Sequence, residues 1–188
     1  MPIAKSLPSL VSLLRLALAP WVAIYILTGR YAAAMVLFVI AAFTDIIDGY
    51  LARRFNLQTK IGAILDPLTD KALVVTIYVS LAVTKDLPFW LVAMVFGRDF
   101  LILLMAGFAM AFTKLRDFPP SRWGKYSTFS QIVTAVTAMV HAGRLLENIG
   151  WILEGFMLAC AFMTAVSGLH YLATGIARLR RATPESAG

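Results

Sequence analysis

Charged residues are scarce in this chain of 188 residues: they make up 14% of it, whereas hydrophobic residues make up 60%. An average soluble domain carries about a quarter charged residues, so this chain cannot cover a globule with a polar surface. That composition disfavours a soluble enzyme and a disordered chain, and no nucleic-acid partner is expected. The single cysteine, Cys160, excludes an internal disulfide and a cysteine-rich metal site. The composition predicts an all-α integral membrane protein.

Six apolar segments are long enough for helices that cross a bilayer, which takes about 20 residues each. They are the ranges 8–29, 31–55, 61–84, 87–113, 121–143 and 148–177. We expect one six-helix transmembrane domain over residues 1–182, followed by a disordered tail at 183–188. A cleaved signal peptide is the alternative for the first segment, but Arg15 and Pro20 interrupt its apolar run.

The basic residues between these segments predict the orientation of the chain. Six spans put both termini on one side, and eleven basic residues fall on that side: Lys5, Arg53, Arg54, Lys60, Lys114, Arg116, Arg122, Lys125, Arg178, Arg180 and Arg181. The opposite loops hold three: Arg30, Lys85 and Arg144. Because basic loops stay in the cytoplasm, both termini are predicted to be cytoplasmic.

Four aspartates at the facing ends of the second and third spans are the most informative charges. Asp45 and Asp48 are three residues apart, and Asp66 and Asp70 are four apart, so each pair shares a helix face. The short loop between the spans predicts antiparallel neighbours, so the four carboxylates can converge in one cleft near the cytoplasmic surface. Four like charges cannot all ionise there unless cations are present. Oxygen ligands suit Mg²⁺ or Mn²⁺, and two such ions would balance the four charges. The alternative is four ordinary loop-end carboxylates paired with nearby arginine and lysine.

The sequence around these aspartates resembles the signature of the CDP-alcohol phosphotransferases. It reads D-x2-D-G-x2-A-R-x8-G-x3-D-x3-D, and every fixed position is met: Asp45, Asp48, Gly49, Ala52, Arg53, Gly62, Asp66 and Asp70. The segment that holds Gly124, Lys125, Thr128 and Gln131 is similar to a Gly-Lys-x-x-Thr segment of members that make glycerophospholipids.

The resemblance implies that the phosphatidyl group of CDP-diacylglycerol passes to an alcohol while CMP leaves. The four aspartates would bind two divalent cations, and Asp70 would also deprotonate the acceptor hydroxyl. Residues implied in holding the CDP-lipid are Ser9, Ser12, Gly49, Arg53, Thr59 and Gly62. Ser9 and Ser12 stand where members of the family usually carry asparagine and threonine. The resemblance also implies a homodimer.

Two basic residues are candidates for binding a phosphate of the acceptor. Arg98 lies beside Asp99 inside an otherwise apolar stretch, and Lys125 lies at the start of the fifth span. The alternatives are a packing pair for Arg98 and Asp99, and a lysine that reaches the membrane interface for Lys125.

The basic residues near the acceptor candidates favour glycerol 3-phosphate as the acceptor, which would give phosphatidylglycerophosphate. Phosphatidylglycerol, which would give cardiolipin, is the alternative, because the Arg98-Asp99 pair resembles the cardiolipin-synthase branch. A divalent-cation transporter is the alternative of another class. We expect a multi-pass protein of the cell membrane with its active site facing the cytoplasm.

Overall fold

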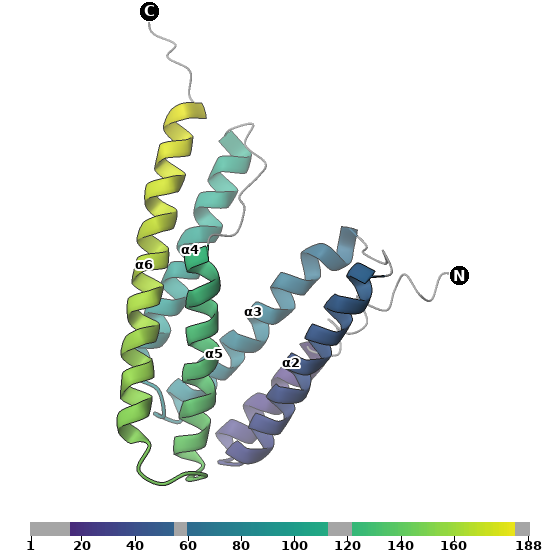
Figure 1. Cartoon of the computed structure of the whole chain (residues 1–188), viewed down its shortest axis with the longest axis vertical. Coiled ribbons are helices and arrows are strands. Elements are labelled where there is room, and N and C mark those ends of the chain that lie inside the picture. Colours follow the sequence, from purple (N-terminus) through teal and green to yellow (C-terminus); the bar gives the residue numbers. More distant parts are fainter. Residues whose placement is uncertain (1–15, 55–59, 113–121, 183–188) are drawn as a thin grey trace, which may run out of the picture. The chain divides into compact units, whose positions relative to one another are not determined.

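The computed structural model describes residues 16–54, 60–112 and 122–182, and within them the side chains of residues 16–44, 71–105 and 123–175. These residues form six helices and no strand (Figure 1). The first helix is Leu16–Leu27. It is followed by α2 (Tyr31–Arg54), α3 (Lys60–Val83), α4 (Phe89–Phe112), α5 (Arg122–Ala142) and α6 (Gly150–Ala182). The all-helical fold class is confirmed.

The helix boundaries follow the hydropathy pattern closely, with one difference. Helices α2 to α5 begin and end within two residues of the predicted spans. Helix α6 continues to Ala182, five residues beyond its predicted end. The extension contains arginines, which lower the hydropathy but are good helix formers, so the helix outlasts its apolar run. In the described part of the chain, the stretch Gly150–Gly175 is long and apolar enough to cross a bilayer.

The chain divides into two compact units. Unit 1 contains residues 1–88 and 135–150, and unit 2 contains residues 89–134 and 151–188. In unit 1, buried residues recur every three or four positions, as at Ala34, Phe38 and Ala41 on α2. In unit 2, polar residues are buried beside apolar ones on α5 and α6: Ser127, Gln131, Thr134, Thr164 and Ser167. The core of unit 2 is therefore more polar than that of unit 1.

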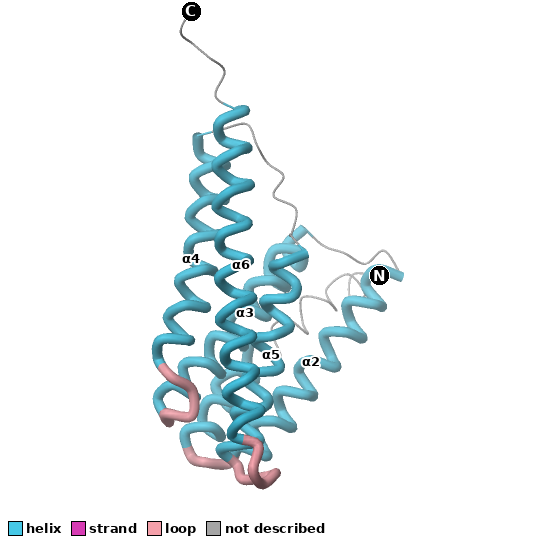
Figure 2. The backbone as a smooth tube through the Cα atoms, turned by 60° about the vertical axis from the view of Figure 1, so that its left-hand side comes forward, coloured by secondary structure: helices cyan, strands magenta, loops and turns pink. Residues whose placement is uncertain are grey.

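Three helices of unit 1 end in the same way. At Gly29, Lys85 and Arg144 the backbone takes positive φ values of 73°, 65° and 50°. In each case the next residue donates its N–H to a carbonyl five positions back, as Asp86 does to Leu81 at 2.9 Å. These are Schellman caps, which satisfy the last carbonyls of a helix. The turns that follow them lie together at one end of unit 1, where Figure 2 shows them in pink.

Candidate functional site

The four aspartates of the predicted site lie on two consecutive helices. Asp45 and Asp48 belong to α2, and Asp66 and Asp70 belong to α3. Their side chains, with those of Gly49, Arg53 and Gly62, lie outside the described ones, and Ser9, Ser12 and Thr59 lie outside the described residues. Among the side chains that are described, no group of three acidic, cysteine or histidine residues could hold a metal ion. The metal site stays a prediction that depends on the helix backbones.

The ends of α2 and α3 determine how these positions line up. The Tyr31 hydroxyl, at the start of α2, donates a hydrogen bond of 2.6 Å to Oδ2 of Asp86, just after the end of α3. At the other ends, only the five residues 55–59 separate the two helices. Since the start of one helix meets the end of the other at both places, α2 and α3 run antiparallel.

This register brings the aspartate positions to two matching levels. At a rise of 1.5 Å per residue, Asp45 lies about 21 Å along α2 from Tyr31, and Asp70 lies about 20 Å along α3 from Val83. Asp48 and Asp66 both lie about 26 Å from those same ends. One aspartate position from each helix therefore occurs at each level.

The hydrogen bond that sets this register belongs to a small polar cluster. The Thr84 hydroxyl also donates to Oδ2 of Asp86, so one carboxylate oxygen accepts from both Tyr31 and Thr84. Helix α5 approaches closely at the same place: a Cβ added at Gly143 would lie 3.0 Å from Cβ of Tyr31 and 3.0 Å from the carbonyl oxygen of Met139. We call Tyr31, Thr84 and Asp86 the end clamp. Sequence analysis missed it because its members are distant in the chain.

Removing the phenolic hydroxyl tests the end clamp. Tyr31→Phe is expected to lower the free energy of unfolding by about 1 kcal/mol, the usual net value of one hydrogen bond. Activity should also fall, because the clamp holds the register of the aspartate helices. Tyr25→Phe is the matched control, because no hydrogen bond of the Tyr25 hydroxyl is found within the described residues. Thermal unfolding in detergent measures the stability of both variants. Equal stability of Tyr31→Phe and Tyr25→Phe would contradict a role for the end clamp.

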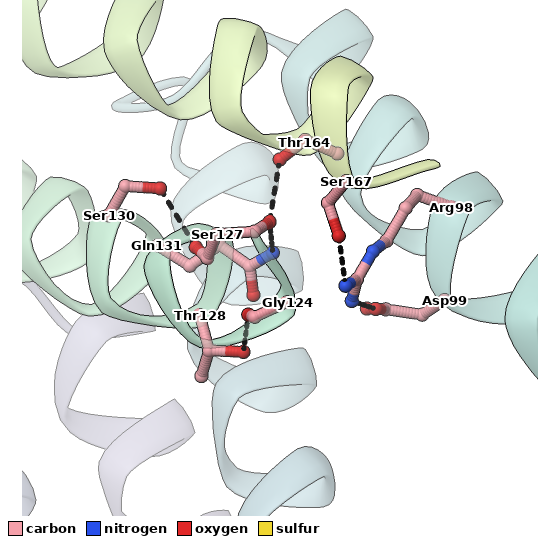
Figure 3. Close-up of polar contacts among 9 residues, drawn as sticks. All are labelled: Arg98, Asp99, Gly124, Ser127, Thr128, Ser130, Gln131, Thr164 and Ser167. Atoms are coloured by element: carbon pink, nitrogen blue, oxygen red, sulfur yellow. Dashed lines mark hydrogen bonds and ion pairs between the residues drawn. The ribbon is translucent and has the colours of Figure 1, made fainter. Parts of the chain in front are cut away.

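A second polar cluster surrounds Arg98 in unit 2. Its guanidinium donates to Oδ1 of Asp99 at 2.7 Å and to Oγ of Ser167 on α6 at 2.5 Å (Figure 3). Its Cζ lies 5.6 Å from the ring centroid of Tyr171, one turn further along α6. The side chain of Arg98 is 10% exposed and that of Asp99 is 12% exposed. The Arg98–Asp99 pair is thus present, and the bond from Arg98 to Ser167 joins α4 to α6.

Helix α6 also contacts α5 through polar groups, one turn from Ser167. The hydroxyls of Thr164 and Ser127 lie 3.3 Å apart, and the Gln131 amide donates to Ser127 at 3.3 Å. Figure 3 shows Thr164 on the same stretch of α6 as Ser167, whereas the bond from Gln131 to Ser127 lies within α5. Side-chain hydrogen bonds between helices take the place that apolar burial has in soluble proteins, because lipid is as apolar as leucine. These contacts fix α5 beside the arginine.

A pocket of about 500 Å³ opens in unit 2 at this point. Its polar lining comes from three helices: Arg98 on α4, Lys125 and Thr128 on α5, and Tyr171 on α6. The rest of its lining is Gly124, Ile102, Phe129 and Ile132. The two residues predicted to bind an acceptor phosphate therefore line one pocket, although 27 positions separate them in the chain. Ser167 and Tyr171 are additions that the sequence did not single out, since nothing local marks them.

The guanidinium of Arg98 has one N–H group that its protein partners do not use. Its Nη atoms bond to Asp99 and Ser167, whereas its Nε is buried and finds no hydrogen-bond partner among the described residues. A buried N–H without a partner costs free energy, so this group can still donate one hydrogen bond. The arrangement can bind a phosphate beside the apolar residues of the pocket.

Comparison with known proteins places these features in a family. The model of the CDP-alcohol phosphatidyltransferase family matches residues 5–167. The chain is 34% identical over 193 residues to the CDP-diacylglycerol--glycerol-3-phosphate 3-phosphatidyltransferase of Bacillus subtilis, covering 88% of this chain and 93% of that protein.

Two longer proteins are similar as well. A protein of Drosophila melanogaster, named "Probable cardiolipin synthase (CMP-forming)", is 32% identical over 176 residues, 91% of this chain and 53% of its own length. The cardiolipin synthase (CMP-forming) / mitochondrial hydrolase fusion protein of Schizosaccharomyces pombe is 35% identical over 126 residues, 66% of this chain and 20% of its own length. The chain thus spans about half of the first and a fifth of the second.

Proposed function

Since the chain belongs to the CDP-alcohol phosphatidyltransferase family, we propose that it transfers the phosphatidyl group of CDP-diacylglycerol to an alcohol and releases CMP. The observation that carries the proposal is the register of α2 and α3, which brings the four motif aspartates to two matching levels. Phosphoryl transfer requires charge neutralisation and an in-line hydroxyl, and carboxylates at two levels can supply both through bound cations and a base. The names of the relatives agree with this reaction.

The family is generally dependent on divalent cations, and the donor set of this chain fits two of them. All four candidate ligands are carboxylates, which provide the hard oxygen atoms that Mg²⁺ and Mn²⁺ prefer. We propose that Asp45, Asp48, Asp66 and Asp70 hold two such ions. When bound, the ions would neutralise the negative charge of the diphosphate. Gly49, Arg53, Thr59 and Gly62, with Ser9 and Ser12, are the proposed contacts to the CDP-lipid.

The proposed role of Asp70 is that of general base. An alcohol must lose its hydroxyl proton as it attacks phosphorus, and a carboxylate within reach can accept that proton. Asp70 lies about 6 Å further along α3 than Asp66, which is four residues at 1.5 Å each. That position is further from the start of α3, and it leaves room for an acceptor hydroxyl beyond the diphosphate.

We propose that the helices span the cell membrane six times with both termini in the cytoplasm. The excess of basic residues on the side of the termini supports this orientation. The end clamp and the three Schellman caps of unit 1 lie at one end of that unit, as expected for loops on the outer side. The active site would then face the cytoplasm, and we propose that the protein acts as a homodimer.

The acceptor is proposed to bind in the pocket of unit 2 through Arg98 and Lys125. Glycerol 3-phosphate fits the basic lining and occurs in the name of the Bacillus subtilis relative. Phosphatidylglycerol is the second candidate, since other relatives are named cardiolipin synthases. Both molecules present a glycerol hydroxyl near a phosphate, so either is compatible with the same chemistry.

Release of CMP is the measurement that tests the proposed function. Purified protein in lipid nanodiscs, supplied with CDP-diacylglycerol, Mg²⁺ and an acceptor, is expected to release one CMP for each lipid product formed. A chelator should stop the reaction, and added Mg²⁺ should restore it. Absence of CMP release with every acceptor would contradict the proposal. Mg²⁺ flux in liposomes without CMP release would instead indicate the cation transporter.

A further inference from the structure

The pocket of unit 2 has an apolar wall as well as its basic residues. Ile102 from α4 and Phe129 and Ile132 from α5 form this wall, and Phe129 is 67% exposed. Large apolar residues close in sequence to those of the wall are also exposed: Phe100, Leu103 and Leu104 on α4 and Tyr126 on α5. In a membrane protein such side chains face lipid. A small water-soluble phosphate has no acyl chain that could cover this wall.

The charge of the pocket is lower than its basic residues suggest. Asp99 forms an ion pair with Arg98 at 2.7 Å, so the two together carry no net charge. Of the described residues that line the pocket, Lys125 then leaves an excess of one positive charge. A phosphate monoester carries about −1.5 to −2 at pH 7, because its second pKa is near 6. A phosphodiester carries a single negative charge and matches the pocket more closely.

From the wall and the charge together, we infer that this pocket binds a glycerol phosphodiester that carries acyl chains, so the acceptor is a phospholipid with a glycerol headgroup. The phosphodiester lies between Arg98 and Lys125, and the acyl chains leave along Ile102, Phe129 and Ile132. The inference rests on the proposed function, of which it specifies the acceptor. It favours phosphatidylglycerol over glycerol 3-phosphate.

The reaction balances without a further reactant. The free primary hydroxyl of the glycerol headgroup forms a new O–P bond to the phosphatidyl phosphorus of CDP-diacylglycerol. The bond between that phosphorus and the oxygen of CMP breaks, and CMP leaves with the electron pair. The hydroxyl proton passes to a carboxylate that acts as general base. The products are CMP and a lipid with two phosphatidyl groups on one glycerol.

A series of acceptors tests the inference with the unmodified protein. Its members are glycerol 3-phosphate, glycerophosphoglycerol, dihexanoyl-phosphatidylglycerol and dioleoyl-phosphatidylglycerol, which separate charge from acyl chains. We expect kcat/KM to rise along this series, with at least a tenfold gain from glycerophosphoglycerol to the dioleoyl lipid, or about 1.4 kcal/mol. Equal or better use of glycerol 3-phosphate would overturn the inference while leaving the proposed function intact. No CMP release with any member would contradict the proposed function itself.

A pair of variants tests whether the wall is the element that binds acyl chains. Phe129→Ser is expected to raise KM for dioleoyl-phosphatidylglycerol about tenfold, near 1.4 kcal/mol, and to leave KM for CDP-diacylglycerol unchanged. Phe162→Ser is the matched control, since Phe162 is 62% exposed on α6 and does not line the pocket. An increase in KM for the donor in place of the acceptor would assign the wall to CDP-diacylglycerol and overturn the inference.

Removing the negative charge of Asp99 tests the match between the charge of the pocket and that of the acceptor. Asp99→Asn keeps an oxygen that can accept the Arg98 hydrogen bond but removes the negative charge, which makes the pocket more positive by one. We expect the preference for phosphatidylglycerol over glycerol 3-phosphate, as a ratio of kcat/KM values, to fall about fivefold, since a monoester gains more from the extra charge. An unchanged ratio would contradict the charge argument, and the acceptor series decides the inference even if this variant does not fold.

Discussion

Asp70→Asn is expected to lower kcat by about 10³-fold, within the range that general acid–base catalysis contributes. Asparagine is close in size to aspartate and keeps an oxygen at the same place, but it cannot accept the hydroxyl proton at neutral pH. The measurement is CMP release under saturating CDP-diacylglycerol and acceptor. Binding of CDP-diacylglycerol, followed as its stabilisation of the protein against heat, should remain.

The matched control for Asp70→Asn is Glu154→Gln, which removes an exposed carboxylate of α6 outside the motif. Its turnover number should equal that of the unmodified protein. Asp66→Asn adds a further distinction, because Asp66 is proposed to bind cations without acting as the base. Its loss of rate should recover in part at high Mg²⁺, whereas the loss in Asp70→Asn should not. Turnover by Asp70→Asn at the normal rate would remove the proposed base.

Arg98→Ala is expected to raise KM for the acceptor by about 10 to 100-fold, since a hydrogen bond to a charged group contributes about 1.5–3 kcal/mol. It should also lower the free energy of unfolding by about 1.5–3 kcal/mol, the usual contribution of a hydrogen bond to a charged group, because Asp99 would lose its 2.7 Å ion pair with Arg98. KM for CDP-diacylglycerol should stay unchanged. Steady-state kinetics and thermal unfolding measure these quantities separately.

A double variant separates binding from packing. In Arg98→Ala/Asp99→Ala both charges of the ion pair are absent, so the loss of stability should be smaller than in Arg98→Ala. If Arg98 binds the acceptor, KM stays high in the double variant. If the pair only packs α4 against α6, KM returns with the stability. Arg98→Lys completes the comparison, because it keeps the charge but loses the planar donors of the guanidinium.

The contrast between the two clusters shows why part of the site could be predicted from sequence. The aspartates are separated by three and four residues within single helices, so helical geometry alone assigns each pair to a face. Arg98 and Ser167 are 69 positions apart in the chain, whereas all eight fixed positions of the motif lie between Asp45 and Asp70. Contacts over such distances depend on which helix faces pack together, and periodicity does not specify this.

The amino-acid sequence by itself was sufficient to predict the positions of the helices and to recognise the family motif. Hydropathy and turn residues act locally, so the ends of α2 to α5 could be located within two residues, and the eight fixed motif positions lie within one helical hairpin. The tertiary structure alone decided the register of that hairpin, through the end clamp, and the gathering of Arg98, Lys125 and Tyr171 around one pocket. The physical reason is that contacts between helices depend on how the small, polar and aromatic side chains of different helices fit together. Those contacts exist only once the helices have packed.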